Sequence, residues 1–479
     1  MAVGVRAGEG PLALDGAARE ELRANVVRAL RTGDGGIASV TLAVDPGIDF
    51  SALVLANRDR AGDAFCFEQP DRDGFVLAGT GTCAGITPDA GDRFASAARG
   101  VRHYAGTIAA SDPASDADAP PGSGPVWVGG FSFAARGGPT PEWSDFAHGG
   151  LALPGVSFAR QAGAARMTLN VMLAGDEDPD EVVERLTVRA ADLRPASMPL
   201  LDPDPVEAAR VASAAPPEHF EAAIARATER IAAGELEKVV LAREVRVHAP
   251  RAIDTAAVYG ALREAFPSCY CYLVDRFEST FLGASPELLV RRDGQRAQTV
   301  ALAGTLRRSA DPAVDRHLAE QLLNGPRFRE EQAIVTRRIE RALDPVSVWV
   351  AAADEPVVVK VQNVQHLGTP IRAQLAEPIS AIELAGLLHP TPAVGGEPAE
   401  RALPLIPALE GLDRGWYAGP LGWTDLAEDG EFCVALRCAL IRDRVAHLYA
   451  GEGIVRDSDP AEELAANEAK LQALLPLLT

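Results

Sequence analysis

The chain contains very little lysine. Of its 46 basic residues only three are lysine, at positions 238, 360 and 470, and the rest are arginine. Arginine stays charged in proteins, whereas lysine can lose its proton when it is desolvated. A lysine retained in such a chain is therefore a candidate for proton transfer. Lys238 stands in "GELEKVVLAREVRV" at the head of an apolar strand, where the alternative is a rim lysine without a chemical role.

Several other signals are absent. The six cysteines show no CxxC or zinc-like spacing, no apolar run is long enough to span a bilayer, and "MAVGVRAGEGPLALDG" lacks the apolar core of a signal peptide. We therefore expect a cytoplasmic protein with reduced core cysteines, as a monomer or weak oligomer. The formal charge of −21 argues against nucleic acid or an anionic membrane as a partner. An anionic small substrate would need a local cationic pocket.

The pattern of elements predicts an α+β fold with antiparallel sheets, because runs of adjacent strands are followed by helices. Two seams rich in Pro and Asp, 109–124 and 196–218, read as an exposed loop and as the connection between a strand-rich half (1–200) and a second half (215–479). Predicted strands are 35–44, 124–133, 165–173, 238–247, 269–275, 279–283, 287–292, 296–303, 346–350, 356–362, 432–441 and 445–450. Predicted helices are 14–33, 216–235, 312–323, 328–343, 380–388 and 460–475.

Two glutamates of the second half stand in apolar surroundings. Glu287 follows a Ser-Pro turn at the start of "ELLV", where it should be hard to ionise, as suits a general acid. The alternative is a rim carboxylate on an edge strand. Glu331 lies at the head of an apolar helical stripe and should point inward, whereas its neighbour Glu330 fits a solvated first-turn glutamate favoured by the helix dipole.

The C-terminal segments add charged residues in unusual places. Arg437 lies in the otherwise apolar "EFCVALRCALI", which predicts that it needs an anion. "SDPAEELAANEAKL" begins a helix with a Ser/Asp cap and places Glu463, Ala466 and Lys470 on one face.

Eight motifs occur in the order seen in chorismate-utilising enzymes: "EKVVLAREV", "GASPELLV", "ALAGTLRR", "NVQHLGTPI", "LHPTPAVGGEP", "YAGPLGW", "FCVALRCA" and "YAGEGIVRDSDP". The resemblance covers residues 215–475 and also "FEQPDRDGFVLAGTGT" in the first half, and it is strongest to the isochorismate synthases of this family. It implies a single interlocked unit, in which two large antiparallel sheets pack together and are flanked by helices. The site would lie in a cleft between the sheets.

The resemblance also implies roles for individual residues. An isochorismate synthase adds water at C2 of chorismate while the C4 hydroxyl leaves; Lys238 matches the family's base and Glu287 its acid. Mg²⁺, held through Glu331 and Glu463, would bind one substrate carboxylate, and an Arg/Tyr pair the other. The positions that match substrate-binding residues are Gly304, His366, Ala393, Tyr417, Arg437, Gly453 and Lys470.

Two residues favour isochorismate synthase over other family members. A lysine at the base position favours water over ammonia as nucleophile. Ala393 stands where lyase members carry threonine. The product would feed menaquinone or siderophore biosynthesis. A salicylate synthase and a degenerate, non-catalytic chorismate-binding protein remain the alternatives.

The sequence departs from the family at its metal site. The family pattern Ser-x-Pro-x-x-Glu-x-x-Glu has alanine, Ala466, at its last position. Gln332 replaces a histidine and Arg327 a lysine, while Glu452 replaces a small residue. We therefore expect a weakened Mg²⁺ site with Glu452 as compensation; a site too poor for catalysis is the alternative.

Overall fold

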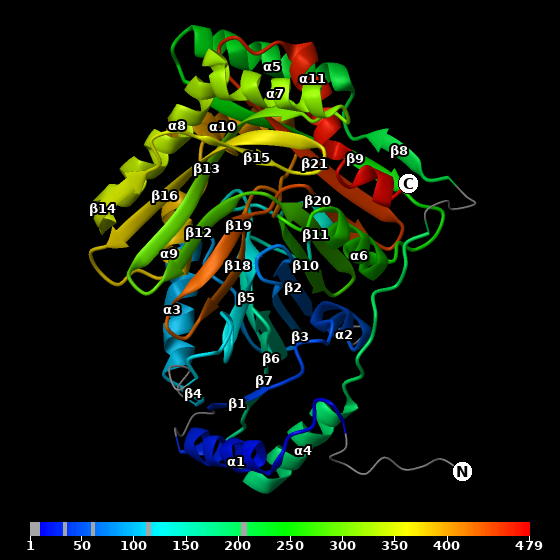
Figure 1. The fold of residues 1–479 in the computed structure, drawn as a ribbon, viewed down its shortest axis with the longest axis vertical. Coiled ribbons are helices and arrows are strands. Elements are labelled where there is room, and N and C mark those ends of the chain that lie inside the picture. The colour runs from blue at the N-terminus through cyan, green and yellow to red at the C-terminus, as the bar shows by residue number, and fades with distance from the viewer. Residues whose placement is uncertain (1–9, 32–35, 59–62, 112–115, 203–207) are drawn as a thin grey trace.

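Twenty-one β-strands form one continuous hydrogen-bonded network in the computed structural model (Figure 1). The structure describes residues 10–31, 36–58, 63–111, 116–202 and 208–479. All its strand pairs are antiparallel except the short parallel pairing of β1 with β4. The α+β class with antiparallel strands and flanking helices is thus confirmed. The sequence predicted two antiparallel sheets that pack together. In the structure, hydrogen bonds join their strands into one network.

The first half of the chain contributes seven strands and four α-helices to the described structure. α1 and α4 pack together at one end of the molecule (Figure 1). The elements are α1 (Gly16–Leu30), β1 (Ile37–Ala43), α2 (Phe50–Ala56), β2 (Ala64–Gln69), β3 (Phe75–Ile86), α3 (Arg93–Ala105), β4 (Ile108–Ala109), β5 (Val126–Phe131), β6 (Gly149–Gln161), β7 (Ala164–Met172) and α4 (Pro179–Asp192).

The chain from residue 208 onward, which includes the end of the predicted connection, carries the remaining strands, with α5, α7 and α11 gathered at the opposite end of the molecule (Figure 1). Its elements are β8 (Arg210–Ser213), α5 (Pro217–Ala232), β9 (Lys238–His248), α6 (Thr255–Ala265), β10 (Tyr270–Arg276), β11 (Ser279–Ser285), β12 (Leu288–Asp293), β13 (Arg296–Arg307), α7 (Pro312–Asn324), α8 (Pro326–Leu343), β14 (Ser347–Ala352), β15 (Val357–Lys360), β16 (Val364–Leu375), α9 (Ala381–Leu388), β17 (Gly396–Glu397), α10 (Ala399–Glu410), β18 (Pro420–Asp425), β19 (Gly430–Val434), β20 (Cys438–Arg442), β21 (Val445–Ile454) and α11 (Pro460–Leu471).

The two halves of the sequence share their β-structure. β2 pairs with β10, with Cys66 opposite Leu273, and β5 pairs with β18, with Val128 opposite Trp423. Two large hydrophobic cores form. Phe131, Trp416 and Phe432 belong to one, and Leu53, Phe158 and Tyr259 to the other. Because strands from both halves build the same ladders, the halves are interlocked.

The sequence patterns did not predict α2, α3, α4, α6, α10, β2, β3, β4, β6, β8, β16, β17 and β18. Proline explains two of these omissions. α10 carries Pro404 and Pro407 inside the helix, and β16 carries Pro370 in mid-strand. Proline removes a backbone donor, so it predicts the end of a helix or strand. α6 was also not predicted, although Asp254 caps it by accepting hydrogen bonds from the backbone NH groups of Ala256 and Ala257.

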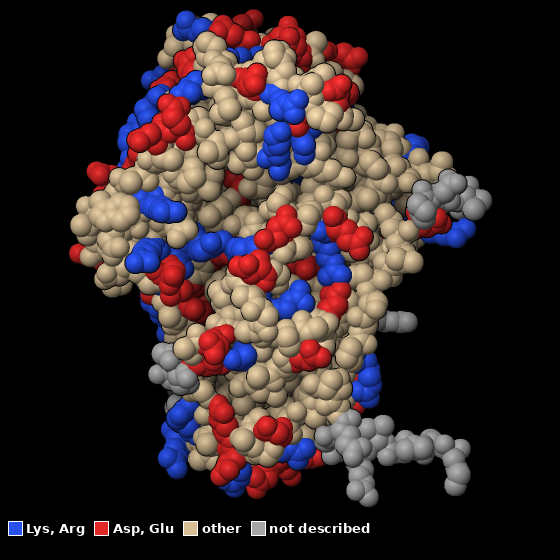
Figure 2. All heavy atoms as spheres, in the orientation of Figure 1, with Lys and Arg blue, Asp and Glu red and all other residues tan. Residues whose placement is uncertain are grey.

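The surface and the cysteines are unremarkable for a globular chain. Acidic and basic side chains are interspersed over the face shown in Figure 2. All six cysteines are free, and all but Cys83 are buried. Among the described residues, no helix is long and apolar enough to cross a membrane.

Candidate active site

One pocket gathers every residue that the sequence singled out for function. It is lined from β9, β13, β16, β21, α8 and α11 and from the loops before β12, β17, β18 and β20, so segments distant in the sequence meet there. The eleven predicted residues that line it are Lys238, Glu287, Gly304, Glu331, His366, Ala393, Tyr417, Arg437, Gly453, Glu463 and Lys470.

Lys238 is a buried residue and not a rim lysine. It is the first residue of β9, its side chain is 1% exposed, and its Nζ donates a hydrogen bond to Glu331 Oε1 at 2.8 Å. Gly453 makes this approach possible, because a Cβ atom there would lie 2.6 Å from Glu331 Oε1 and 2.9 Å from Lys238 Cε. The structure therefore places the candidate base in contact with a carboxylate that can stabilise its protonated form.

Glu287 is likewise buried, with 4% of the residue exposed. It directly precedes β12, and its carbonyl accepts a hydrogen bond from the backbone NH of Val434. Burial raises the pKa of its carboxyl to about 8, although the positive charges of Lys238 and Arg437 oppose the shift. Glu287 therefore holds a proton at neutral pH, which a general acid requires.

Arg437 does not lie within a strand, as the apolar pattern had predicted, but in the bend between β19 and β20. Its φ angle is +48°, a left-handed backbone conformation that few residues other than glycine adopt. Its Nη1 is buried without a hydrogen-bond partner, and no carboxylate of the described chain forms an ion pair with it. A buried guanidinium without a counter-ion is a site for an anion.

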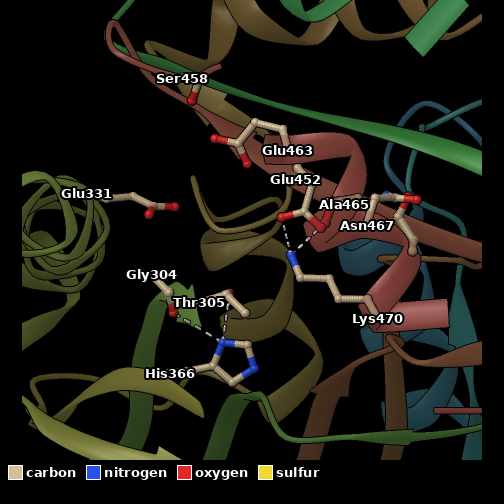
Figure 3. Close-up of polar contacts among 12 residues, drawn as sticks. Gly304, Thr305, Glu331, His366, Glu452, Ser458, Glu463, Ala465, Asn467 and Lys470 are labelled. Carbon is tan, nitrogen blue, oxygen red and sulfur yellow. Dashed lines mark hydrogen bonds and ion pairs between the residues drawn. The ribbon is translucent and has the colours of Figure 1, made fainter. Parts of the chain in front are cut away.

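His366 fixes this guanidinium. Nη2 of Arg437 lies 3.1 Å from His366 Nε2, which must be the acceptor because a guanidinium has only donors. The proton of the imidazole is then on Nδ1, which lies 3.2 Å from the carbonyl oxygen of Gly304 (Figure 3). Burial lowers the pKa of His366 well below its usual value, so the ring is neutral. Gly304 itself has a φ angle of +65° at a bulge in β13.

Two tyrosines form one wall of the pocket. The rings of Tyr417 and Tyr449 are stacked with centroids 5.5 Å apart, and the Tyr449 hydroxyl is buried without a hydrogen-bond partner. Tyr449 was not predicted from the sequence. The signal was available, because alternate residues of a strand share a face and Tyr449 lies two and four residues before Gly451 and Gly453.

Glu331 and Glu463 point from α8 and α11 toward the same space (Figure 3). Each already has a basic partner, because Glu331 contacts Lys238 and Glu463 contacts Arg327. Each of these contacts engages one oxygen of the carboxylate, Oε1 in both cases. Ala466 lines the pocket one turn beyond Glu463 and offers no ligand. Within the described residues, no three His, Cys, Asp or Glu side chains are grouped closely enough to hold a metal.

Glu452 is a third buried carboxylate of the pocket, with 3% of the residue exposed. Its Oε2 lies 2.7 Å from Lys470 Nζ, while its Oε1 has no hydrogen-bond partner. Burial raises the pKa of this carboxyl to about 7, and the nearby charge of Glu463 adds to the shift. Glu468 is instead largely exposed, 3.7 Å from Arg243, so it cannot take the place of the missing ligand at position 466.

The fold and the pocket define the class of protein. The menaquinone-specific isochorismate synthase MenF of Escherichia coli superposes with a TM-score of 0.75 and 28% identity, covering 96% of this chain and 100% of that one. The isochorismate synthase DhbC of Bacillus anthracis gives 0.70 and 27%, covering 89% and 99%. Anthranilate synthase component I of Streptococcus pneumoniae shares the fold at 19% identity, with a TM-score of 0.66 and coverage of 91% and 92%.

A family model described as "Chorismate binding enzyme" matches residues 24–479, and the chain belongs to this enzyme family. The isochorismate synthase MenF of Bacillus subtilis is 36% identical over 355 residues, which are 74% of this chain and 75% of that protein. A salicylate biosynthesis isochorismate synthase of Pseudomonas aeruginosa is 37% identical over 74% of each chain.

Proposed function

We propose that the chain is an isochorismate synthase, which converts chorismate to isochorismate by attack of water at C2 and loss of the C4 hydroxyl. The observation that carries this proposal is the burial of Lys238 and Glu287 in one pocket, where the raised pKa of Glu287 keeps its carboxyl protonated. Relatives of the chain in the same enzyme family are named isochorismate synthases, which supports this assignment.

The chain's own residues suffice for the proton transfers. Lys238, as the free amine, takes a proton from the attacking water while the C2–O bond forms and both ring double bonds shift toward C4. Glu287 gives its proton to the C4 oxygen as that bond breaks, so one water enters and one leaves. A proton then returns from the Lys238 ammonium to Glu287 through solvent before the next turnover. Glu331 stabilises the protonated form of Lys238 until that proton is released.

The two carboxylates of chorismate need different partners. Arg437 presents an unpartnered Nη1 into the pocket beside Tyr417, which together suit one carboxylate. For the other we propose Mg²⁺, held by Glu331 and Glu463. Mg²⁺ binds through one or two carboxylates plus substrate oxygens and keeps several waters, so a two-carboxylate donor set fits it. When bound, the ion neutralises the charge of the substrate carboxylate.

Glu452 is the proposed compensation for the alanine at position 466. Its Oε1 has no hydrogen-bond partner, and its carboxyl is near enough to Glu463 for that charge to raise its pKa, so a further carboxyl group lies beside the proposed metal ligands. The result is a site that binds Mg²⁺ weakly and mainly in the presence of substrate.

Ala466→Glu is expected to lower the Mg²⁺ concentration for half-maximal activity by about tenfold, since changes around a metal shift its affinity by that order. Glu452→Ala should raise it. Titrating Mg²⁺ against activity in both variants tests this, with Glu468→Ala as the control for an exposed acid on α11. If the natural chain is inactive at every Mg²⁺ concentration and Ala466→Glu is active, the natural chain binds chorismate without converting it.

Isochorismate should be the product that accumulates, because Lys238 favours water as the nucleophile and Ala393 stands where lyase members carry threonine. The measurement is chromatography of purified protein incubated with chorismate and Mg²⁺, under conditions that separate isochorismate, salicylate and anthranilate. Salicylate and pyruvate in equal amounts, without an added lyase, would assign the chain to the salicylate synthases instead.

A further inference from the structure

A second cavity lies behind the loop that carries Ala393, and it shares no lining residue with the active-site pocket. Its volume is about 520 Å³, within the range of small-molecule sites. It is built where the start of α3, the segment after β5, the loop after α9 and helix α10 meet. α3 and α9 pack directly on each other (Figure 1).

The cavity contains a buried cation that lacks a counter-ion. Arg93 is 8% exposed, its Nη2 donates to the carbonyls of Ser132 and Phe133, and its Nε is buried without a partner. No carboxylate of the described chain forms an ion pair with Arg93. Burial accordingly lowers its pKa to about 10. Arg136, exposed at the rim, adds a second positive charge. The cavity is therefore suited to an anion.

The acidic residues of the cavity do not supply that anion. The Glu410 carboxylate forms a buried ion pair with Arg414 and also accepts a hydrogen bond from the backbone NH of Ala242. Asp413 accepts hydrogen bonds from the backbone NH of Gly138 and from the hydroxyl of Thr140. Both carboxylates are satisfied within the protein, so the charge of Arg93 remains uncompensated.

The cavity also offers one hydrogen-bond acceptor. His389 Nε2 lies 2.9 Å from the carbonyl oxygen of Phe133, so the imidazole carries its proton on Nε2. Its Nδ1 is then an acceptor, and it is buried without a partner. Burial lowers the pKa of His389 to about 3, which keeps the ring neutral. A ligand with an O–H group would satisfy this nitrogen.

Apolar side chains complete the cavity. The His389 ring contacts the rings of Phe94 and Phe133, with centroids 5.9 and 5.8 Å away. Leu403 and Ile406 of α10 also line the space. A donor for a carboxylate, an acceptor for a hydroxyl and flanking aromatic rings together describe one ligand chemistry. We propose that this cavity binds a small aromatic acid that carries a hydroxyl group.

The position of the cavity connects it to the active site. Arg414, which lines the cavity, donates from Nη1 to the carbonyl of Val394 and from Nη2 to that of Val240, at 2.8 and 2.9 Å. Val394 and Val240 line the active-site pocket. His389 begins the loop that continues to Ala393. A bound acid would therefore lie beside Arg414, which holds two residues of the active-site wall.

Isothermal titration calorimetry on the full chain tests the proposal, with the three hydroxybenzoate isomers, benzoate and phenol as probes. At least one hydroxybenzoate should bind more tightly than benzoate and phenol. Arg93→Met should weaken it by about tenfold or more, since a hydrogen bond to a charged group is of that order. Arg99→Met, an exposed arginine on the same helix, is the matched control and should bind like the wild type.

Two further variants test whether the acid binds in this cavity or in the active site. Leu403→Trp fills the cavity and should abolish binding even if Arg93→Met is poorly folded, which thermal unfolding will show. Arg437→Met removes the anion anchor of the active site and should leave binding unchanged. Binding that is lost in Arg437→Met but kept in Leu403→Trp would place the acid in the active site and overturn the proposal. So would the absence of any binding at millimolar concentrations.

Discussion

Lys238→Arg is expected to lower kcat by about 10²–10⁴-fold, the usual contribution of a general acid or base, while chorismate still binds. Arginine carries a positive charge beside Glu331, as the protonated form of Lys238 does, so chorismate should still find a cationic pocket. Arginine cannot release a proton near neutral pH, however, so it cannot accept one from the attacking water. The measurements are kcat by product chromatography and the Kd for chorismate by calorimetry.

Lys360→Arg is the matched control. Lys360 makes an ion pair with Asp315 at 2.9 Å outside the pocket, where arginine serves as well as lysine. This variant should retain the wild-type rate. If Lys238→Arg kept more than a tenth of that rate, the base would have to be another group.

Glu287→Gln should reduce kcat by a comparable factor, about 10²–10⁴-fold. The amide has nearly the shape of the carboxyl and can still donate a hydrogen bond to the C4 hydroxyl. It cannot give up a proton as the C4–O bond breaks. Chorismate binding should persist, since the variant replaces a carboxyl that is neutral at pH 7 with another neutral group. A rate near that of the wild type would place the acid elsewhere.

The pH dependence of the wild type provides an independent check on Glu287. Because its pKa in the folded protein is raised to about 8, the protonated, active form is present below that pH and is lost as the pH rises through it. The kcat of the wild type should therefore fall above about pH 8. The residual activity of Glu287→Gln should not fall above about pH 8. If the decline persists in this variant, the titration of another group causes it.

Local patterns in the sequence predicted much of this structure. The helix predicted over 216–235 is α5, and its residues Phe220, Ile224, Ala227 and Ile231, which recur with the period of an amphipathic helix, are buried. The Ser-Pro turn before Glu287 indicated a carboxylate in apolar surroundings, and that residue is buried. Such features depend on residues that are close together in the chain, so they can be predicted from the sequence.

Contacts between residues distant in the sequence could not be predicted from such local patterns. The contact of Lys238 with Glu331 joins residues 93 positions apart, and that of Arg327 with Glu463 joins residues 136 apart. Only the folded sheet brings them together. The bend at Arg437 was missed because its apolar neighbours continue the pattern of a strand on both sides. The cavity at Arg93 is assembled from four segments that are distant in the sequence, and no pattern within any one of them predicts it.

The origin of the new hydroxyl group tests the central claim most directly. The enzyme would be incubated with chorismate and Mg²⁺ in water enriched in oxygen-18, and the isolated product analysed by mass spectrometry with fragmentation that locates the label. Attack of water at C2 predicts one solvent oxygen per isochorismate, at the C2 hydroxyl. Isochorismate without solvent oxygen would mean that the C4 hydroxyl migrates within the substrate, which contradicts the roles assigned to Lys238 and Glu287.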